Sequence, residues 1–562
     1  MSRKILVTCA MPYANGDLHL GHMLEYIQTD IWVRFQKTLG NKCYFICSDD
    51  SHGTAIMLHA KKKNIKPKEL IYHIKKKHIY DLKKFKIDFD IYSCTHTKIN
   101  KINVEKIYKI LTYKGFIYCK KIKQLFDPIK KIFLSDRLIL GNCPKCNANK
   151  QYGDMCEFCG ITYKPFDLIN PISVLTGIKP IKKYSNHYFF KLPYFTKFLN
   201  KWINNSGVVK NMIYNQLKSW FKVGLIEWDI SRDSPYFGFK IPNLKKLKFF
   251  YVWIDATIGY LSTVQELCYK KRLDFNEIWN IKSKYEIYHF IGKDIIYFHT
   301  LFWPTILKTM NLKLPTKINC HGFVTINDKK MSKSKGTFIK AKFYEKFIEP
   351  EYLRYYFSSK INSNIEDIDI NFKDFFYKIN SDLIGKIINI ASRCYKLINK
   401  YNKNYLSKNI ENKILIKSFI NIGDKIYFNY EKLDFYKVVK KILNLANQTN
   451  SYITKKSPWS LNEKKKQYII EVCSMGLNLF RQLIIYLSPI LPKLAIKVKN
   501  FLNLKTLNWK SRKKLLINHK IKKFNPLLNR IEKIPEAGFE PARQKKAGDF
   551  KSPASTNSAI RA

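Results

Sequence analysis

The sequence is poor in acidic residues: 43 Asp and Glu residues stand against 101 Lys and Arg residues, so the 562-residue chain carries a formal net charge of +58. A surplus of this size predicts a polyanionic partner, with nucleic acid as the first candidate. Most of the surplus is Lys, in a chain also crowded with Ile, Asn, Tyr and Phe. AT-rich codons encode these residues, so the basicity supports RNA binding without establishing it.

Common nucleotide-binding and export signals are also missing. The chain contains neither GxxxxGK[ST] nor GxGxxG, so a bound nucleotide would be held by neither common phosphate loop. The first ten residues, MSRKILVTCA, lack an apolar core followed by a cleavage site. Arg481 and two prolines interrupt the apolar stretch 476–496, which predicts a core helix rather than a membrane span. We expect a soluble cytoplasmic protein with no membrane segment.

The length predicts three or four domains, and the amino-terminal pattern predicts an α/β fold. Residues 4–10 predict a buried strand, residues 18–40 a helix with Asp17 as its N-cap, and residues 41–53 a second strand. This order predicts a parallel sheet that binds ligands at the carboxyl ends of its strands. A second α/β set is predicted in residues 249–260, 286–307 and 318–325. Amphipathic stretches beyond residue 372 predict a helical bundle.

Two Cys-x-x-Cys pairs occur nine residues apart, Cys143 with Cys146 and Cys156 with Cys159. Four thiolates in two tight turns can surround one zinc ion tetrahedrally. One or two redox pairs are the alternative, which a reducing compartment disfavours. Since four cysteines leave no open coordination position, we predict one structural Zn²⁺.

His19 and His22 lie three residues apart around Gly21, after the first strand. They could be zinc ligands, an acid–base pair, ordinary helix residues or part of a phosphate cradle at a helix start. A second phosphate candidate, KKMSKSKGT at 329–337, concentrates lysine in a stretch that could also be a solvated basic loop. Such a loop could close over a triphosphate and stabilise the charge of the leaving pyrophosphate.

HLGH at 19–22 and KMSKS at 330–334, in this order, resemble the two signature motifs of the class I aminoacyl-tRNA synthetases. Further stretches resemble the methionyl-tRNA synthetase family, from about residue 4 to about residue 533: ILVTCAMPYANG, FICSDDSHGT, WDISRDSPYFGF, YVWIDA, YHFIGKDI and HGFVTINDKKMSKSKGT. The resemblance implies a Rossmann-like catalytic α/β domain with a zinc-containing insertion, followed by an α-helical bundle. The implied limits are 1–115 and 232–328 for the catalytic halves, 116–231 for the connective insertion, 329–372 for the KMSKS loop and stem-contact region, 373–534 for the anticodon-binding domain, and 535–562 for an anomalous, disordered tail.

The resemblance implies a methionine–tRNA ligase. Such an enzyme activates L-methionine with ATP and Mg²⁺ to methionyl-adenylate, releases pyrophosphate, and transfers methionine to the 3′ end of initiator and elongator tRNA(Met). The reaction needs positioning and charge stabilisation rather than a side-chain nucleophile or base. The alternatives are a class I synthetase for Leu, Ile or Val, which would carry a longer editing insertion, or a non-catalytic zinc-containing RNA-binding paralogue.

The resemblance also assigns residues to roles. His19, His22 and Lys333 would be catalytic, and ATP would contact His19, Gly21, His22, Asp294, Lys330 and Lys333. The methionine site would comprise Met11, Tyr13, Asp50, Arg232, Trp253, Ala256, Tyr260, Ile295, His299 and Trp303, with Asp50 binding the ammonium group. Cys143, Cys146, Cys156 and Cys159 would bind zinc, while Asn389, Arg393 and, on a later helix, Trp459 would read the anticodon.

Two residues depart from the family pattern, because Met11 stands where leucine is usual and Thr257 where proline is frequent. We therefore expect a slightly different pocket rim. The family's optional carboxyl-terminal module for tRNA binding and dimerisation has no counterpart before the tail, so we expect a monomer.

Overall fold

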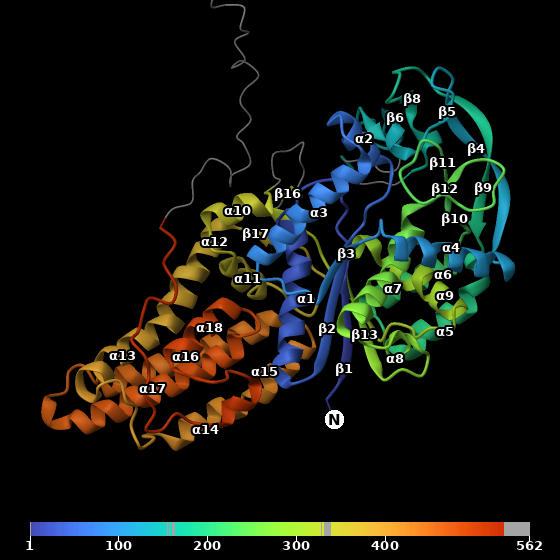
Figure 1. Ribbon diagram of the computed structural model, residues 1–562. Helices are drawn as coiled ribbons and strands as arrows, with labels where there is room; N and C mark the ends of the chain where they lie inside the picture. The colour runs from blue at the N-terminus through green and yellow to red at the C-terminus, as the bar shows by residue number, and fades with distance from the viewer. Residues whose placement is uncertain are drawn as a thin grey trace, which may run out of the picture. The chain divides into compact units, whose positions relative to one another are not determined.

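The computed structural model describes residues 2–153, 156, 158–159, 163–326, 329–330 and 339–532 (Figure 1). It divides into two compact units: unit 1 comprises residues 1–17 and 25–321, and unit 2 comprises residues 18–24 and 322–562. The predicted tail at 535–562 and the lysine of KMSKS at 333 lie outside the described residues. The predicted domain limits stay predictions.

Unit 1 is built around a five-stranded parallel sheet with the order β14-β13-β1-β2-β3. Its strands are β1 (Lys4–Cys9), β2 (Lys42–Asp49), β3 (Ile91–Cys94), β13 (Tyr285–Gly292) and β14 (Lys317–His321). Five of the six β1 residues are buried, as expected for a strand covered on both faces. The chain order reverses between β1 and β13, and such a switch point is where open α/β sheets bind ligands. The predicted parallel sheet is confirmed.

The helix after β1 begins later than the sequence predicts. It is α1 (Leu20–Leu39), and His19 rather than Asp17 occupies its N-cap position. The prediction failed because Leu18 and Leu20 pair with distant backbone: the Leu18 carbonyl accepts from Ala341 N–H at 2.9 Å, and Leu20 N–H donates to the Ile339 carbonyl at 3.1 Å. An extended segment at 18–19 therefore replaces the expected first turn.

The remaining helices of unit 1 cover the sheet or belong to the segment between β3 and β13. They are α2 (Thr54–Lys62), α3 (Pro67–Lys84), α4 (Lys98–Tyr113), α5 (Thr196–Ser206), α6 (Asn211–Val223), α7 (Val252–Lys271), α8 (Phe275–Trp279) and α9 (Trp303–Thr309). The helix α7 is buried along most of its length and contacts β2 and β3, so it brings its side chains to the ligand end of the sheet.

Three smaller sheets occupy the segment between α4 and α7. One has the order β10-β9-β4-β5, the second β7-β6-β8, and the third pairs β11 with β12. Their strands are β4 (Ile117–Asp127), β5 (Ile132–Phe133), β6 (Ile139–Asn142), β7 (Gln151–Tyr152), β8 (Ile169–Ser173), β9 (Ile181–Phe190), β10 (Trp228–Asp229), β11 (Ser231–Asp233) and β12 (Lys248–Phe250).

Unit 2 is mainly helical, as predicted. Its helices are α10 (Ala341–Phe347), α11 (Pro350–Ser358), α12 (Phe372–Tyr377), α13 (Asn389–Asn402), α14 (Lys413–Asn421), α15 (Gly423–Glu431), α16 (Phe435–Lys456), α17 (Lys466–Leu487) and α18 (Pro492–Phe501). A small sheet joins β16 (Lys329–Lys330), β15 (Val324–Ile326) and β17 (Ile368–Ile370).

Within the described part of the chain, one helical segment, residues 463–487, is long and apolar enough to cross a membrane by length and composition, and 89% of its most apolar window is buried inside the protein. It contains α17 at the centre of the bundle (Figure 1). Arg481 is buried in this helix and donates to the carbonyls of Lys514 and Ser511, at 2.6 and 2.5 Å. Such burial fits a core helix, in which buried polar groups need hydrogen-bond partners.

Candidate active site

Asp50 and Tyr13 meet where β1 and β2 end. The loop after β1 continues the parallel pairing, because Asp50 N–H donates to the Pro12 carbonyl at 2.9 Å and Ala14 N–H donates to the Asp50 carbonyl at 2.8 Å. Burial and the nearby Asp255 carboxylate raise the pKa of Asp50 well above its usual range. Its Oδ1 atom is buried and has no hydrogen-bond partner among the described residues. A cationic ligand would satisfy this oxygen and favour the ionised carboxylate.

Tyr260 and His299 form a buried polar pair with a defined proton arrangement. The Nε2 atom of His299 lies 2.9 Å from the Tyr260 hydroxyl, and its Nδ1 atom lies 3.0 Å from the Ile295 carbonyl. A carbonyl only accepts, so Nδ1 carries the proton and Nε2 accepts from the tyrosine. Burial lowers the pKa of His299 to about 4. The pair is therefore uncharged at neutral pH.

His289 on β13 extends this cluster, and the sequence did not predict it. The indole Nε1–H of Trp303 donates to His289 Nε2 at 3.2 Å, and His289 Nδ1 lies 2.5 Å from the Thr8 hydroxyl. Since an indole only donates, His289 is neutral with its proton on Nδ1. The Tyr260 ring lies 5.1 Å from the His289 ring and 5.9 Å from the Trp303 ring.

Trp253, in the first turn of α7, stacks on Phe298 with 3.7 Å between ring centroids and 7° between planes. Phe298 opens a π-helical turn, Phe298–Phe302, which also contains His299. Trp228 approaches Phe298 to 5.3 Å. Single-turn π segments are frequent at functional sites. The sequence predicted Trp253 and missed Phe298 and Trp228, which no local pattern distinguishes from core aromatics.

Met11 lies against the middle of α7. Its sulfur accepts from the Ser48 hydroxyl at 3.1 Å, and a Cβ atom added to Gly259 would come within 3.2 Å of the Met11 methyl group. Thr257 is buried, and its hydroxyl donates to the Trp253 carbonyl at 3.0 Å. The substituted threonine is thus satisfied within its own helix. Ala256 is buried on the same helix, and Ile295 is partly buried after β13.

His19 and His22 form a reciprocal cap at the start of α1. His19 N–H donates to His22 Nδ1 at 3.2 Å, and Gly21 N–H donates to His19 Nδ1 at 3.1 Å. This is the logic of a capping box, with imidazoles in place of the usual hydroxyl and carboxylate. A backbone N–H can only donate, so both Nδ1 atoms accept, and each neutral ring carries its proton on Nε2. The two rings lie 3.8 Å apart beside a helix amino terminus.

Asp294 follows β13 and is exposed. Its Oδ1 atom would lie 2.5 Å from a Cβ atom added to Gly292, so a side chain at residue 292 would displace this carboxylate. Lys330 is the second residue of β16, with its backbone opposite Thr325. The side chain of Lys330 and all of Lys333 lie outside the described residues.

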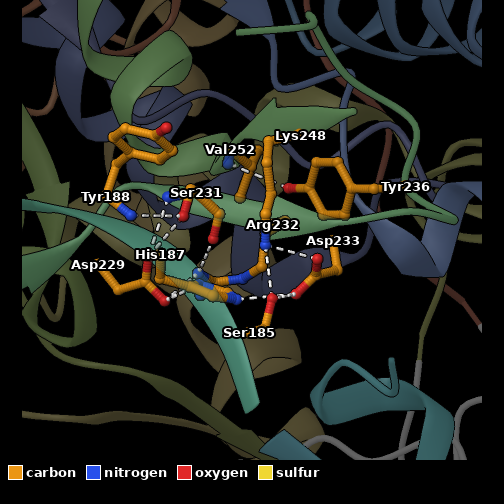
Figure 2. A network of polar contacts seen from close by, with 10 residues as sticks. All are labelled: Ser185, His187, Tyr188, Asp229, Ser231, Arg232, Asp233, Tyr236, Lys248 and Val252. Carbon is orange, nitrogen blue, oxygen red and sulfur yellow. Dashed lines mark hydrogen bonds and ion pairs between the residues drawn. The ribbon is translucent and has the colours of Figure 1, made fainter. Parts of the chain in front are cut away.

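Arg232 belongs to β11 and joins a polar network (Figure 2). Its guanidinium carbon lies 3.7 Å from the centroid of the Tyr251 ring, and its Nη1 atom lies 3.4 Å from an Asp229 oxygen. Tyr251 immediately precedes α7, the helix that carries Trp253. The predicted Arg232 is therefore linked through one aromatic ring to the start of the helix that carries the predicted pocket.

A second polar chain, which the sequence did not predict, lies two residues beyond Asp50. His52 Nδ1 lies 2.5 Å from Asp255 Oδ2, and His52 Nε2 lies 2.8 Å from His96 Nδ1. Burial raises the pKa of Asp255 well above its usual range and lowers that of His52 to about 3. Burial therefore disfavours the charged form of both partners.

The four predicted metal ligands come together as the sequence indicated. The sulfurs of Cys143, Cys146, Cys156 and Cys159 all lie within 4.8 Å of one another. Two sulfur–sulfur distances are 3.7 Å (Cys143 to Cys159) and 3.6 Å (Cys146 to Cys156). Four sulfurs at Zn–S bonds of roughly 2.3 Å form a tetrahedron with edges of about 3.8 Å, whereas a disulfide measures about 2.05 Å. The cluster has the dimensions of a tetrahedral thiolate site for a metal ion.

The thiolate form is stabilised at one ligand. Burial would raise the pKa of Cys143, but the N–H groups of Cys146 and Lys145 point at its sulfur and lower the pKa to about 6. A deprotonated sulfur is what a metal ion requires.

Two of the three predicted anticodon residues are in contact in unit 2. The guanidinium carbon of Arg393 lies 4.5 Å from the centroid of the Trp459 ring, and Trp459 is 49% exposed. Asn389 begins α13 four residues before Arg393 and is also exposed. The prediction that Trp459 lies on a later helix is wrong: it lies in the turn after α16, which ends at Lys456 because Ser457 is left-handed and Pro458 cannot continue the helix.

Comparison with known proteins gives two family matches. Residues 5–395 match the model described as tRNA synthetases class I (M), and residues 409–548 match the anticodon binding domain of methionyl tRNA ligase. The chain is 51% identical over 534 residues to the methionine–tRNA ligase of Vesicomyosocius okutanii, covering 94% of this chain and 97% of that one. It is 53% identical over 538 residues to the same-named protein of Wigglesworthia glossinidia brevipalpis, with the same coverage.

A solved structure confirms the predicted fold class. Mycobacterium tuberculosis methionyl-tRNA synthetase in complex with methionyl-adenylate superposes with a TM-score of 0.76 at 20% identity, covering 94% of this chain and 99% of that one. The shared fold is an α/β catalytic domain followed by a helical domain.

Proposed function

The chain belongs to the methionyl family of the class I tRNA synthetases, and from this premise we propose that it activates L-methionine with ATP and transfers it to tRNA(Met). The methionine carboxylate attacks the α-phosphorus of ATP, and pyrophosphate leaves. The terminal ribose hydroxyl of the tRNA then attacks the carbonyl carbon, and AMP leaves. The observation that carries the proposal is the identity of about half of all residues with methionine–tRNA ligases across 94% of the chain.

The methionine side chain would lie among uncharged aromatic groups. Neutral His299 and Tyr260 suit a thioether, which is apolar and only a weak acceptor, and sulfur packs favourably against aromatic rings. The other proposed lining residues are Met11, Tyr13, Trp253, Ala256, Ile295 and Trp303. Branched aliphatic substrates would lack the sulfur–ring contacts, which supports methionine over Leu, Ile or Val.

The charged end of methionine would meet two groups of opposite sign. Asp50 would accept from the ammonium group, and its unpartnered buried oxygen supports this role. Arg232 would face the carboxylate. Charge-assisted hydrogen bonds of this kind are roughly twice as strong as neutral ones.

ATP binding would use donors rather than a general base. The Nε2–H groups of His19 and His22 are suited to phosphate oxygens, and Gly21 leaves the backbone accessible between them. Asp294 would accept from ribose hydroxyls, while Lys330 and Lys333 would neutralise the phosphates, with Mg²⁺ accompanying ATP. The reaction then needs preorganised charge at the α-phosphate.

The Cys₄ cluster would hold one structural Zn²⁺, because its four ligands leave no open position. Asn389, Arg393 and Trp459 would read the anticodon of initiator and elongator tRNA(Met), since an exposed indole and guanidinium suit unstacked bases. The monomeric state and the cytoplasmic location stay predictions, to be tested by light scattering and fractionation.

ATP–pyrophosphate exchange dependent on the amino acid tests the proposed reaction. We expect exchange with methionine and little with leucine, isoleucine or valine. Exchange with leucine but not methionine would overturn the substrate, and no exchange with any of them would support a non-catalytic RNA-binding protein. Lys333→Ala should lower the adenylation rate far more than the affinity for methionine.

A further inference from the structure

His187 lies buried between two carboxylates on the strand β9 (Figure 2). Its Nδ1 atom lies 2.7 Å from Asp229 Oδ2, and its Nε2 atom lies 2.8 Å from Asp233 Oδ2. Ionised carboxylates only accept hydrogen bonds, so both ring nitrogens must carry protons. The geometry therefore requires an imidazolium, and the two carboxylates, working against burial, raise the pKa of His187 above its ordinary value.

The charges that face His187 divide into two sides. On one side, Lys248 on β12 lies 2.5 Å from Asp233 Oδ1, and the Ser185 hydroxyl donates to Asp233 at 2.9 Å. On the other side is Asp229. Lys120, opposite His187 on β4, pairs with Glu227 at 3.4 Å. Because Lys248 already pairs with Asp233, the positive charge of His187 acts mainly on Asp229.

Asp229 connects His187 to Arg232. The same oxygen, Oδ2, lies 2.7 Å from His187 and 3.4 Å from Arg232 Nη1. Arg232 rests on the Tyr251 ring, and the neighbouring Val252 N–H contacts the Tyr236 hydroxyl at 3.0 Å. The network thus runs from an insertion strand to the first residue of α7.

We propose that His187 is a positioning residue for methionine binding, whose imidazolium shares Asp229 with Arg232 and so keeps the guanidinium over Tyr251 for the substrate carboxylate. If the imidazolium is lost, Asp229 Oδ1 keeps its hydrogen bonds from the Ser231 N–H and hydroxyl, at 3.0 and 3.1 Å, but Oδ2 attracts Arg232 more strongly and draws the guanidinium off the ring. The inference rests on the proposed function, because that function assigns the methionine carboxylate to Arg232.

His187→Gln is the primary test, because glutamine removes the charge but stays polar. In ATP–pyrophosphate exchange we expect the KM for methionine to rise roughly tenfold, about 1.4 kcal/mol, while kcat per active site changes less than twofold. Active sites are counted by adenylate formation, so that misfolded protein does not contribute. The matched control is His73→Gln, which breaks an exposed histidine–glutamate pair at 3.7 Å on α3 and should leave the KM unchanged.

A double-mutant cycle separates positioning from general structural support. Arg232→Gln should raise the KM for methionine, and adding His187→Gln should raise it no further, since the coupled residues act through one group. Asp229→Asn is the second variant, with the same expected non-additivity, if His187→Gln does not fold. An unchanged KM in both variants, or equal KM increases in the wild-type and Arg232→Gln backgrounds, would overturn the inference. Absence of methionine-dependent exchange in the wild type would instead overturn the proposed function.

Discussion

Replacing His78 with glutamine should destabilise unit 1, because this imidazole ties α3 to the loop that carries Tyr13. His78 is fully buried, with Nδ1 at 2.7 Å from Asp49 Oδ1 and Nε2 at 2.8 Å from the Gly16 carbonyl. Both partners only accept, so His78 is an imidazolium. Asp49 ends β2, one residue before Asp50.

The expected decrease in the free energy of unfolding depends on the groups that still contact Asp49 after the substitution. Removing one partner of a buried ion pair costs about 3–5 kcal/mol, because the other charge stays buried. Tyr92 still donates its hydroxyl to Asp49 Oδ1 after the substitution, which favours the lower end, about 3 kcal/mol. His59→Gln is the matched control: it removes only a hydrogen bond to the Asn15 carbonyl in the same loop and should cost about 1 kcal/mol.

The pH dependence has a definite sign. Burial lowers the pKa of His78, but the hydrogen bond and charge of Asp49 more than offset this and raise it above its ordinary value. Because the pKa of His78 is higher in the folded than in the unfolded chain, the protonated ring stabilises the folded state. This stabilisation is complete below the unfolded pKa of about 6.5 and is lost as the pH rises through the folded pKa. Urea unfolding of wild type, His78→Gln and His59→Gln across pH 5.5–9 would measure it. A loss under about 1 kcal/mol at pH 6 for His78→Gln, or a pH-independent loss, would refute the imidazolium assignment.

Three further predictions concern separate parts of the protein. Tyr260→Phe leaves the Nε2 atom of His299 buried without its donor. In pyrophosphate exchange, the KM for methionine should rise by a factor equivalent to about 1–3 kcal/mol, while the KM for ATP stays unchanged. Cys146→Ser should reduce the zinc content below one ion per chain in metal analysis; wild-type protein without zinc would contradict the site. Trp459→Ala should spare exchange but weaken tRNA charging, and equal loss in both assays would contradict a separate anticodon reader.

Features with a local cause were predictable from the sequence. The strand at 4–10 is a β-branched apolar run, and the two Cys-x-x-Cys pairs form their turns within a few residues, so both appear as expected. The start of α1 was not predictable, because the backbone that displaces Asp17 lies some three hundred residues later, at Ile339 and Ala341. The prediction for Trp459 was wrong although the sequence marks the end of α16: Ser457 precedes Pro458, and neither a proline nor the residue before it favours continuation of a helix.

The protonation states of the histidines show why the site required the structure. His289 is held neutral because its Nε2 atom faces the Trp303 indole N–H, which only donates, whereas His299 faces the Tyr260 hydroxyl and is held neutral by burial. His78 and His187 have acceptors at both nitrogens and must be charged. The partners of His289 and His187 lie between fourteen and 281 residues away in the chain. Since burial and the partner at the second nitrogen decide the charge, only the folded chain separates histidines that stay neutral from those that supply a fixed positive charge.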